Sequence, residues 1–144
     1  MIKEVSLNDI ILFNELGLII NSNFDKLFIL SDILSSEYDY LYGYYDNNIL
    51  VGFIHISKMY EVIDIVNIVV NKDYRKRGIA TLLINYVIEK FDDVESILLE
   101  VNEHNSDAIS LYLNNKFYEV NRRLGYYGND AAIIMKRDVC NERC

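Results

Sequence analysis

The chain contains no proline and no tryptophan, and cysteine and glycine are scarce, at two and six among 144 residues. Without proline, internal repeats or low-complexity tracts, nothing in the sequence indicates a linker between domains. A chain of this length is about one domain long and can bury one proper core. We therefore expect a single domain over residues 1–138, followed by a polar tail over residues 139–144.

Both cysteines, Cys140 and Cys144, lie in the tail sequence CNERC with no histidine nearby, so we expect no zinc site and no other metal. No apolar run reaches the ~18 residues that a membrane span requires. The first residues, MIKEVSLND, lack the basic-then-apolar pattern of a signal peptide. These features predict a reduced, cytoplasmic setting without membrane contact.

Acidic residues outnumber basic ones by 22 to 14, which gives a formal net charge of −8. An acidic surface disfavours direct binding of nucleic acid and suits a basic protein or a polyamine as partner. The hydrophobic content of 51% and the aromatic content of 12% are too high for a disordered chain. The composition therefore predicts a folded acidic protein with a cationic partner.

The most informative stretch of the sequence runs from Ile63 to Ala80. Its first part, Ile63–Val70, is rich in β-branched residues and predicts a strand that is buried on both faces. Four of the 14 basic residues follow between Lys72 and Arg77, and an amphipathic helix begins after Gly78. The predicted order is a buried strand, a basic loop and a helix.

Such a junction directs backbone N–H groups and the positive end of the helix dipole at one place, beside cationic side chains. Gly78 has no Cβ, so an anion can approach the backbone closely there. A solvated basic turn is the alternative interpretation. Positive charge gathered at a helix start, against the overall sign of the chain, favours a phosphate site.

The order of the other elements indicates one α/β (α+β) domain built on a mixed sheet. Strands are expected at Ile2–Val5, Tyr38–Tyr45, Ile49–Ser57, Ser96–Asn102, Phe117–Leu124 and Ala131–Arg137. Helices are expected at Leu7–Leu16, Asp25–Ser35, from Ile79 to about Lys90, and at Ala108–Asn114.

Two segments resemble the Gcn5-related N-acetyltransferase (GNAT) family. The loop Arg75–Ala80, RKRGIA, is similar to the family's Arg/Gln-x-x-Gly-x-Gly/Ala pyrophosphate loop, and it lies between a strand and a helix as that loop does. The segment Asn105–Phe117, NSDAISLYLNNKF, is similar to the family's second signature, Asn-x-x-Ala-x-x-Leu-Tyr followed by a strand that contains Phe. The resemblance implies a single mixed, mostly antiparallel, twisted sheet of six to seven strands with about four helices. It also implies acetyl-CoA as cosubstrate.

A narrower resemblance is to the ribosomal-protein-alanine N-acetyltransferases of this family, carried by LLEVNEHN and by the C-terminal NRRLGYYGNDAAIIM. The matching C-terminal residues are Arg122, Arg123, Tyr126, Tyr127, Asp130, Ala131 and Met135. This resemblance implies transfer of acetyl to the α-amine of an N-terminal alanine on a basic ribosomal protein. Asn102, Lys116 and the missing Pro-Trp pair between the first two helices depart from the subfamily pattern.

Glu100 is the candidate general base. Strand alternation sets it on one face of SILLEVN with Leu98 and Asn102, where a carboxylate between apolar neighbours would be partly desolvated. It could act directly or through a water molecule. The alternative is an ordinary solvent-facing carboxylate on a strand.

Tyr112 is the candidate general acid, on the helix that follows the strand of Glu100. Its phenol, with a reference pKa of ~10 against ~8.5 for a simple thiol, could protonate the leaving thiolate. Its place in the second signature supports this role. The alternative is a tyrosine that only packs in the core, in a chain with 12 tyrosines.

The cosubstrate is expected to contact the end of the central strand, the basic loop and two helix starts. The backbone of Ile68, Val69 and Val70 would pair with the pantetheine arm, and Arg75, Lys76, Arg77, Gly78, Ile79, Ala80 and Thr81 would hold the pyrophosphate. By resemblance, Asn105 would bind the pantetheine arm, although it could equally be a plain helix N-cap. Tyr126 and Tyr127 would line the acceptor groove or merely pack.

Two alternatives to a ribosomal acceptor stay open. The acceptor could be a small amine, such as a polyamine or an amino acid, which the acidic composition and the missing Pro-Trp pair would suit. The chain could also be a noncatalytic module that binds acetyl-CoA, although the presence of both Glu100 and Tyr112 speaks against it. The sequence is compatible with a monomer or a homodimer.

Overall fold

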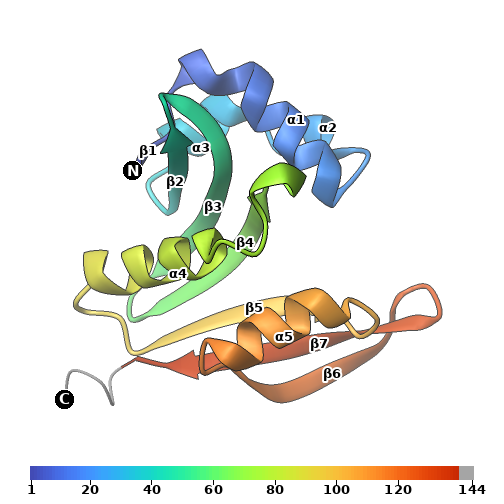
Figure 1. The fold of residues 1–144 in the computed structure, drawn as a ribbon. Coiled ribbons are helices and arrows are strands. Elements are labelled where there is room, and N and C mark those ends of the chain that lie inside the picture. The colour runs from blue at the N-terminus through green and yellow to red at the C-terminus, as the bar shows by residue number, and fades with distance from the viewer. Residues whose placement is uncertain (140–144) are drawn as a thin grey trace. The chain divides into compact units, whose positions relative to one another are not determined.

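A computed structural model of the chain describes residues 1–139, except for the side chains of Tyr126 and Tyr127. Over these residues it contains seven strands and five α-helices (Figure 1). The strands are β1 (Ile2–Glu4), β2 (Asp39–Asp46), β3 (Ile49–Met59), β4 (Val62–Val70), β5 (Ser96–Asn102), β6 (Tyr118–Tyr127) and β7 (Asp130–Asp138). The helices are α1 (Ile10–Ile20), α2 (Phe24–Leu27), α3 (Leu30–Ser35), α4 (Ile79–Lys90) and α5 (Ser106–Asn114), with short 3-10 helices at Leu7–Asp9 and Lys72–Tyr74. The predicted polar tail, residues 139–144, lies outside the described residues except for Val139, which is fully buried and donates its N–H to the carbonyl of Glu95 at 2.8 Å, so Val139 belongs to the packed domain and not to a polar tail.

The strands are hydrogen-bonded in the order β1-β2-β3-β4-β5-β7-β6. The pairs β1–β2, β2–β3, β5–β7 and β6–β7 are antiparallel, and β4 pairs with β5 in parallel through Val62–Asp64 and Ser96–Leu98. The sheet is therefore mixed and mostly antiparallel, as predicted. The chain forms two compact units, one of Met1–Lys58 with Val66–Phe91 and one of Met59–Ile65 with the residues from Asp92 on.

In the first unit, helices α1 to α3 pack on one face of the strands and α4 on the other. Phe13 of α1, Phe24 of α2 and Phe53 of β3 are fully buried, with ring centroids 4.9–6.1 Å apart. On the opposite face, the buried ring of Tyr42 in β2 meets Tyr86 of α4 at 5.0 Å. Aromatic side chains on alternating strand positions thus fasten helices to both faces.

In the second unit, α5 is tied to the strands at its C-terminal end. The buried Arg137 of β7 donates from Nη1 to the carbonyl of Asn115, at 3.1 Å. Tyr112 of α5 packs edge-on against Phe117, with ring centroids 5.7 Å apart. On β5 the buried positions alternate as predicted, because Ile97, Leu99 and Val101 are buried and the intervening side chains are not.

The second predicted helix is wrong in its extent. The segment Asp25–Ser35 was expected to be one helix, but it forms α2 and α3, separated at Phe28 and Ile29, which both have extended backbone. Phe28 leaves the helical path and packs against Phe24, at 4.9 Å, and against the ring of His55, at 5.9 Å. Tertiary packing of one aromatic side chain therefore overrides the local helical pattern.

Two smaller expectations also fail. The first helix begins as a 3-10 turn with a capping box at Ser6 and continues four residues beyond its predicted end, to Ile20. The strand at Ile63–Val70 is not buried on both faces, because Asp64 and Val66 are exposed while Ile63 and Ile65 are buried.

No helix within residues 1–139 is long and apolar enough to cross a membrane.

Candidate active site

The basic loop between β4 and α4 is held in shape by its own side chains. Arg75 donates from Nε to the carbonyl of Val70 at 3.3 Å, and Arg77 donates from Nη2 to the carbonyl of Asp73 at 3.2 Å. The Arg77 guanidinium also lies over the ring of Tyr74, 4.8 Å from the centroid. Arginine bonds to backbone carbonyls therefore organise a loop whose outer surface stays cationic.

The β2–β3 hairpin also anchors this loop. The hydroxyl of Tyr74 donates to Oδ2 of Asp46 at 2.9 Å, and Asp46 ends β2 at the hairpin turn. The backbone N–H of Asn71 donates to the carbonyl of Val51 in β3 at 2.7 Å. The loop is thus fixed to the β2–β3 hairpin as well as to β4.

Helix α4 begins at the end of this loop without a side-chain cap. Its N-cap is Gly78, with φ +76° and no side chain to accept from the first N–H groups. A Cβ placed on Gly78 would meet no atom within 4 Å, so the space above this residue is open. Ile79 is buried and orients the helix, whereas Gly78 and the three basic side chains before it are exposed. An uncapped helix start, open space and neighbouring cations fit a diphosphate.

The end of β4 continues directly into the loop. Val69 and Val70 are buried and Ile68 is half-buried, so this segment is fixed by packing. A Cβ on Gly52 of β3 would approach the carbonyl of Val69 to 2.9 Å, so glycine permits the close spacing of the two strands there. The backbone of Ile68–Val70 therefore has a defined position next to the basic loop.

Glu100 lies on β5 in the second unit, with 31% of its side chain exposed. Its Oε1 is 2.8 Å from Nη2 of Arg123 in β6. Asp64 of β4 pairs with Leu98 of β5 and therefore lies on the sheet face of Glu100. Burial and the charge of Glu100 together raise the pKa of Asp64. The sequence did not predict either neighbour. The expected partial desolvation of Glu100 is therefore not found: Glu100 is an exposed strand carboxylate that pairs with a cation and shares its sheet face with a second carboxylate.

Tyr112 and Asn105 lie on α5. Tyr112 is 7% exposed, and burial raises its pKa to about 12. Its hydroxyl makes no hydrogen bond to any described residue. Asn105 caps the helix, since its Oδ1 accepts from the N–H of Ala108 at 3.3 Å. The plain capping interpretation of Asn105 therefore holds, whether or not it has a second role.

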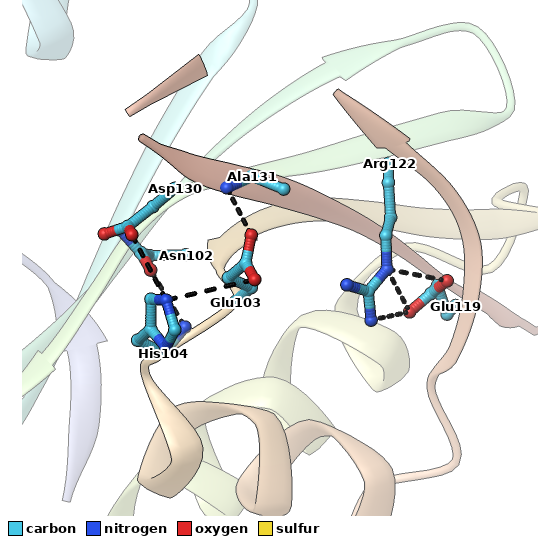
Figure 2. A network of polar contacts seen from close by, with 7 residues as sticks. All are labelled: Asn102, Glu103, His104, Glu119, Arg122, Asp130 and Ala131. Carbon is cyan, nitrogen blue, oxygen red and sulfur yellow. Dashed lines mark hydrogen bonds and ion pairs between the residues drawn. The ribbon is translucent and has the colours of Figure 1, made fainter. Parts of the chain in front are cut away.

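A polar network beside Asn105 was missed by the sequence analysis (Figure 2). Nε2 of His104 lies 3.2 Å from Oδ1 of Asp130, and Nδ2 of Asn102 donates to the other oxygen of Asp130 at 3.3 Å. Glu103 accepts from the backbone N–H of Ala131. These contacts join the end of β5 to the start of β7, so Glu103 and His104 have a structural role. The sequence does not reveal this role, because Asp130 and Ala131 lie far from these residues along the chain.

A second histidine, His55 of β3, is 3% exposed and has two partners that the sequence analysis also missed. Its Nε2 lies 2.7 Å from Oδ1 of Asp39, and its Nδ1 lies 3.3 Å from Nδ2 of Asn67. An amide NH₂ can only donate, so Nδ1 accepts, and the ring proton on Nε2 is donated to Asp39. The imidazole is therefore held as one tautomer.

The predicted residues fall into two groups. The first unit contains the basic loop, Ile68–Val70 and the start of α4 with Ala80 and Thr81; the second contains Glu100, Asn105 and Tyr112. The side chains of Tyr126 and Tyr127, whose backbone belongs to β6, lie outside the described part of the structure. Within residues 1–139 no three His, Cys, Asp or Glu side chains are grouped so that they could hold a metal ion.

Comparison with known proteins identifies the family of the chain. The model of the acetyltransferase (GNAT) family matches residues 15–117. A [ribosomal protein bS18]-alanine N-acetyltransferase of Salmonella typhimurium is 36% identical over 75 residues, which are 48% of this chain. The aligned stretch spans about half, 51%, of that relative's length.

Solved structures show the same fold at low sequence identity. The ribosomal-protein-S18-alanine N-acetyltransferase from Escherichia coli superposes with a TM-score of 0.78 at 21% identity, over 96% of this chain and 93% of that one. An aminoglycoside 6'-N-acetyltransferase complexed with coenzyme A gives a TM-score of 0.79 at 18% identity, over 96% and 97%. The predicted fold is therefore confirmed. With more than half of its length matched by the family model, the chain belongs to the acetyltransferase (GNAT) family.

Proposed function

We propose that the chain is an acetyl-CoA-dependent N-acetyltransferase whose acceptor is the N-terminal α-amine of a ribosomal protein that begins with alanine. The observation that carries the acetyl-CoA part is the uncapped start of α4 at Gly78, with open space above it and three basic side chains before it. The backbone N–H groups there, with Arg75, Lys76 and Arg77 around them, would hold the diphosphate. The pantetheine arm would lie along Ile68–Val70, where a backbone N–H can polarise the thioester oxygen.

Glu100 acts as the general base in this proposal. The acceptor amine must lose a proton as its nitrogen forms a bond to the acetyl carbon, and the Glu100 carboxylate takes that proton directly or through one water. Arg123, at 2.8 Å, holds one carboxylate oxygen and leaves the other for the amine. Arg123 therefore orients the base.

Tyr112 acts as the general acid. As the bond between the acetyl carbon and sulfur breaks, negative charge develops on the sulfur, and the phenol O–H donates a hydrogen bond to it, along which the proton can follow. With a pKa of about 12, Tyr112 keeps its proton through the neutral range. It is also a weaker acid than a simple thiol, whose pKa is ~8.5, so its contribution is a hydrogen bond that strengthens as the bond breaks.

The chemistry of the amine favours an α-amine acceptor. A free α-amine has a pKa of ~7.7–8.0 and a lysine side chain ~10.4, so neutral lysine costs roughly 3 kcal/mol more near neutral pH. The ribosomal acceptor is supported by the ribosomal-protein-alanine N-acetyltransferase that is 36% identical to part of this chain. Such an acceptor would imply a cytoplasmic location and a basic partner. The coenzyme A complex of an aminoglycoside acetyltransferase keeps a small-amine acceptor as the second candidate.

The test of this function is an acetyl-transfer assay with acetyl-CoA and three acceptors: a basic peptide that begins with alanine, a peptide whose only free amine is lysine, and spermidine. We expect the alanine peptide to be preferred. Preference for spermidine would replace the ribosomal acceptor by a small amine. Binding of acetyl-CoA without turnover of any acceptor would support the noncatalytic module.

Replacement of Gly78 by alanine tests the diphosphate site. We expect coenzyme A affinity to fall by about tenfold or more, because the methyl group enters the open space where the diphosphate would approach the backbone. The left-handed backbone adds a stability cost of about 1 kcal/mol. Calorimetric titration with coenzyme A measures the affinity.

Gly128→Ala is the matched control for this substitution. Gly128 has φ +66°, and a Cβ added there would likewise meet nothing within 4 Å, but this residue lies in the β6–β7 turn. It carries a similar backbone cost without touching the basic loop. Equal loss of coenzyme A affinity in both variants would show that backbone strain, and not the loop site, is responsible.

A further inference from the structure

A pocket in the first unit has no part in the function described so far. It has a volume of about 370 Å³ and lies between the α2–α3 connection and strands β2, β3 and β4. Its apolar lining includes Phe28, Ile29 and Val66, and its polar lining includes Asp32, Asp39 and His55. Two carboxylates and one imidazole thus lie within an otherwise largely apolar hollow.

The negative charge of Asp39 is not cancelled by its histidine partner. Burial lowers the pKa of His55, against the opposing effects of the hydrogen bond and charge of Asp39. The tautomer set by Asn67 supplies Asp39 with one neutral N–H donor, at Oδ1. Asp39 keeps 27% of its side chain exposed, and its second oxygen has no hydrogen-bond partner among the described residues. Asp32, an exposed residue of the lining, adds a second negative charge.

The pocket adjoins the strand segment assigned to the pantetheine arm. Val66 lines the pocket, and Ile68, the first residue of that segment, follows two positions later on β4. Two residues of a strand span about 7 Å. An acceptor that reached the thioester beside Ile68 would therefore have the pocket within a few residues of its reacting amine.

We propose that this pocket binds a lysine or arginine side chain of the acceptor polypeptide, with the aliphatic stem against Phe28, Ile29 and Val66 and the cationic head at Asp39 and Asp32. Charge complementarity selects this occupant, because a pocket that combines apolar side chains with two carboxylates matches a long aliphatic side chain with a cationic tip. This inference rests on the proposed function, which makes the acceptor a polypeptide. The pocket would be a second determinant of acceptor specificity, besides the site of the α-amine.

The test uses binding, which does not depend on turnover. The full chain, saturated with coenzyme A, is titrated with Nα-acetylated peptides that begin with alanine and carry one lysine at the second, third or fourth position, and with counterparts that carry norleucine there. Norleucine keeps the stem and removes the charge. We expect one lysine peptide to bind about tenfold more tightly than its norleucine counterpart.

Asp39→Asn should abolish that preference, because it keeps an oxygen to accept from His55 and removes only the charge. Asp32→Asn, at an exposed position, should reduce the preference and serves if the Asp39 variant does not fold. The control is Glu15→Gln on α1, which changes the net charge by the same amount away from the pocket and should retain the preference. Thermal unfolding midpoints verify that each variant is folded.

The possible results separate the pocket from the reaction. Equal binding of lysine and norleucine peptides, no binding of either, or a preference that survives in both aspartate variants overturns the pocket assignment. Spermidine is titrated in the same way, and spermidine binding that depends on Asp39, without any lysine preference, would assign the pocket to a polyamine and overturn the proposal. If Asp39-dependent binding is found but the unacetylated peptides are not turned over, the proposed function fails and the pocket stands.

Discussion

Glu100→Gln should lower the turnover number by about a hundredfold near pH 7, with little change in coenzyme A affinity. Glutamine has nearly the same shape and keeps an oxygen for Arg123, so the change removes the proton acceptor and leaves the geometry of β5 and β6 in place. The loss should be greatest at low pH, where an α-amine with a pKa of ~7.7–8.0 is mostly protonated, and should shrink above pH 8. Steady-state rates from pH 6 to 9 measure it.

Glu95→Gln is the control for Glu100. Glu95 also lies in the second unit, just before β5, and its side chain is exposed. Its replacement should leave both the rate and the pH profile unchanged. A Glu100→Gln variant with the wild-type rate at pH 6 would remove Glu100 from the mechanism, and Asp64 on the same face would become the next carboxylate to examine.

Tyr112→Phe should also lower turnover by about a hundredfold, but uniformly between pH 6 and 9. The phenol keeps its proton over this whole range because its pKa is raised to about 12. The ring packing on Phe117 is retained, and the lost hydroxyl has no hydrogen-bond partner among the described residues, so the free energy of unfolding should change little. The two catalytic variants are therefore distinguished by the shape of their pH profiles.

An acyl donor with a more acidic thiol should partly rescue Tyr112→Phe, since a better leaving group needs less help from an acid. Tyr118→Phe is the control. It removes the hydroxyl that donates to Asp138 at 2.7 Å on the same unit, and it should leave the rate unchanged. If Tyr112→Phe has full activity with acetyl-CoA, Tyr112 is a packing residue and the leaving thiolate takes its proton from solvent.

The sequence was sufficient where local pattern and long-range structure agree. Strand β5 has the predicted ends, Ser96 and Asn102, because its alternation of apolar and polar residues matches a sheet that is covered on one face. Gly78 was predicted to start α4, since a residue without a Cβ followed by helical spacing marks that junction. The family was predictable from the same loop, which combines basic residues and glycine at a fixed place between strand and helix.

The sequence was insufficient where a register shift decides which side chains meet. Counted back from the Asn47-Asn48 turn, Asp39 would lie opposite Ile56 and on the face away from His55. The irregularity between Tyr44 and Tyr45 moves the pairing by one residue, so Asp39 lies opposite Ser57 and on the face of His55. The contact between Arg123 and Glu100 was hidden in the same way, because β6 has two register shifts along its pairing with β7.

The arginines of the basic loop have a consequence for binding kinetics. Arg75 and Arg77 are already bonded to Val70 and Asp73, and Tyr74 is already bonded to Asp46. The loop would therefore lose little conformational entropy on binding a nucleotide, and its backbone would not need to rearrange. If this loop holds the nucleotide as proposed, weakening of these internal bonds would make the loop rearrange on binding and would slow association.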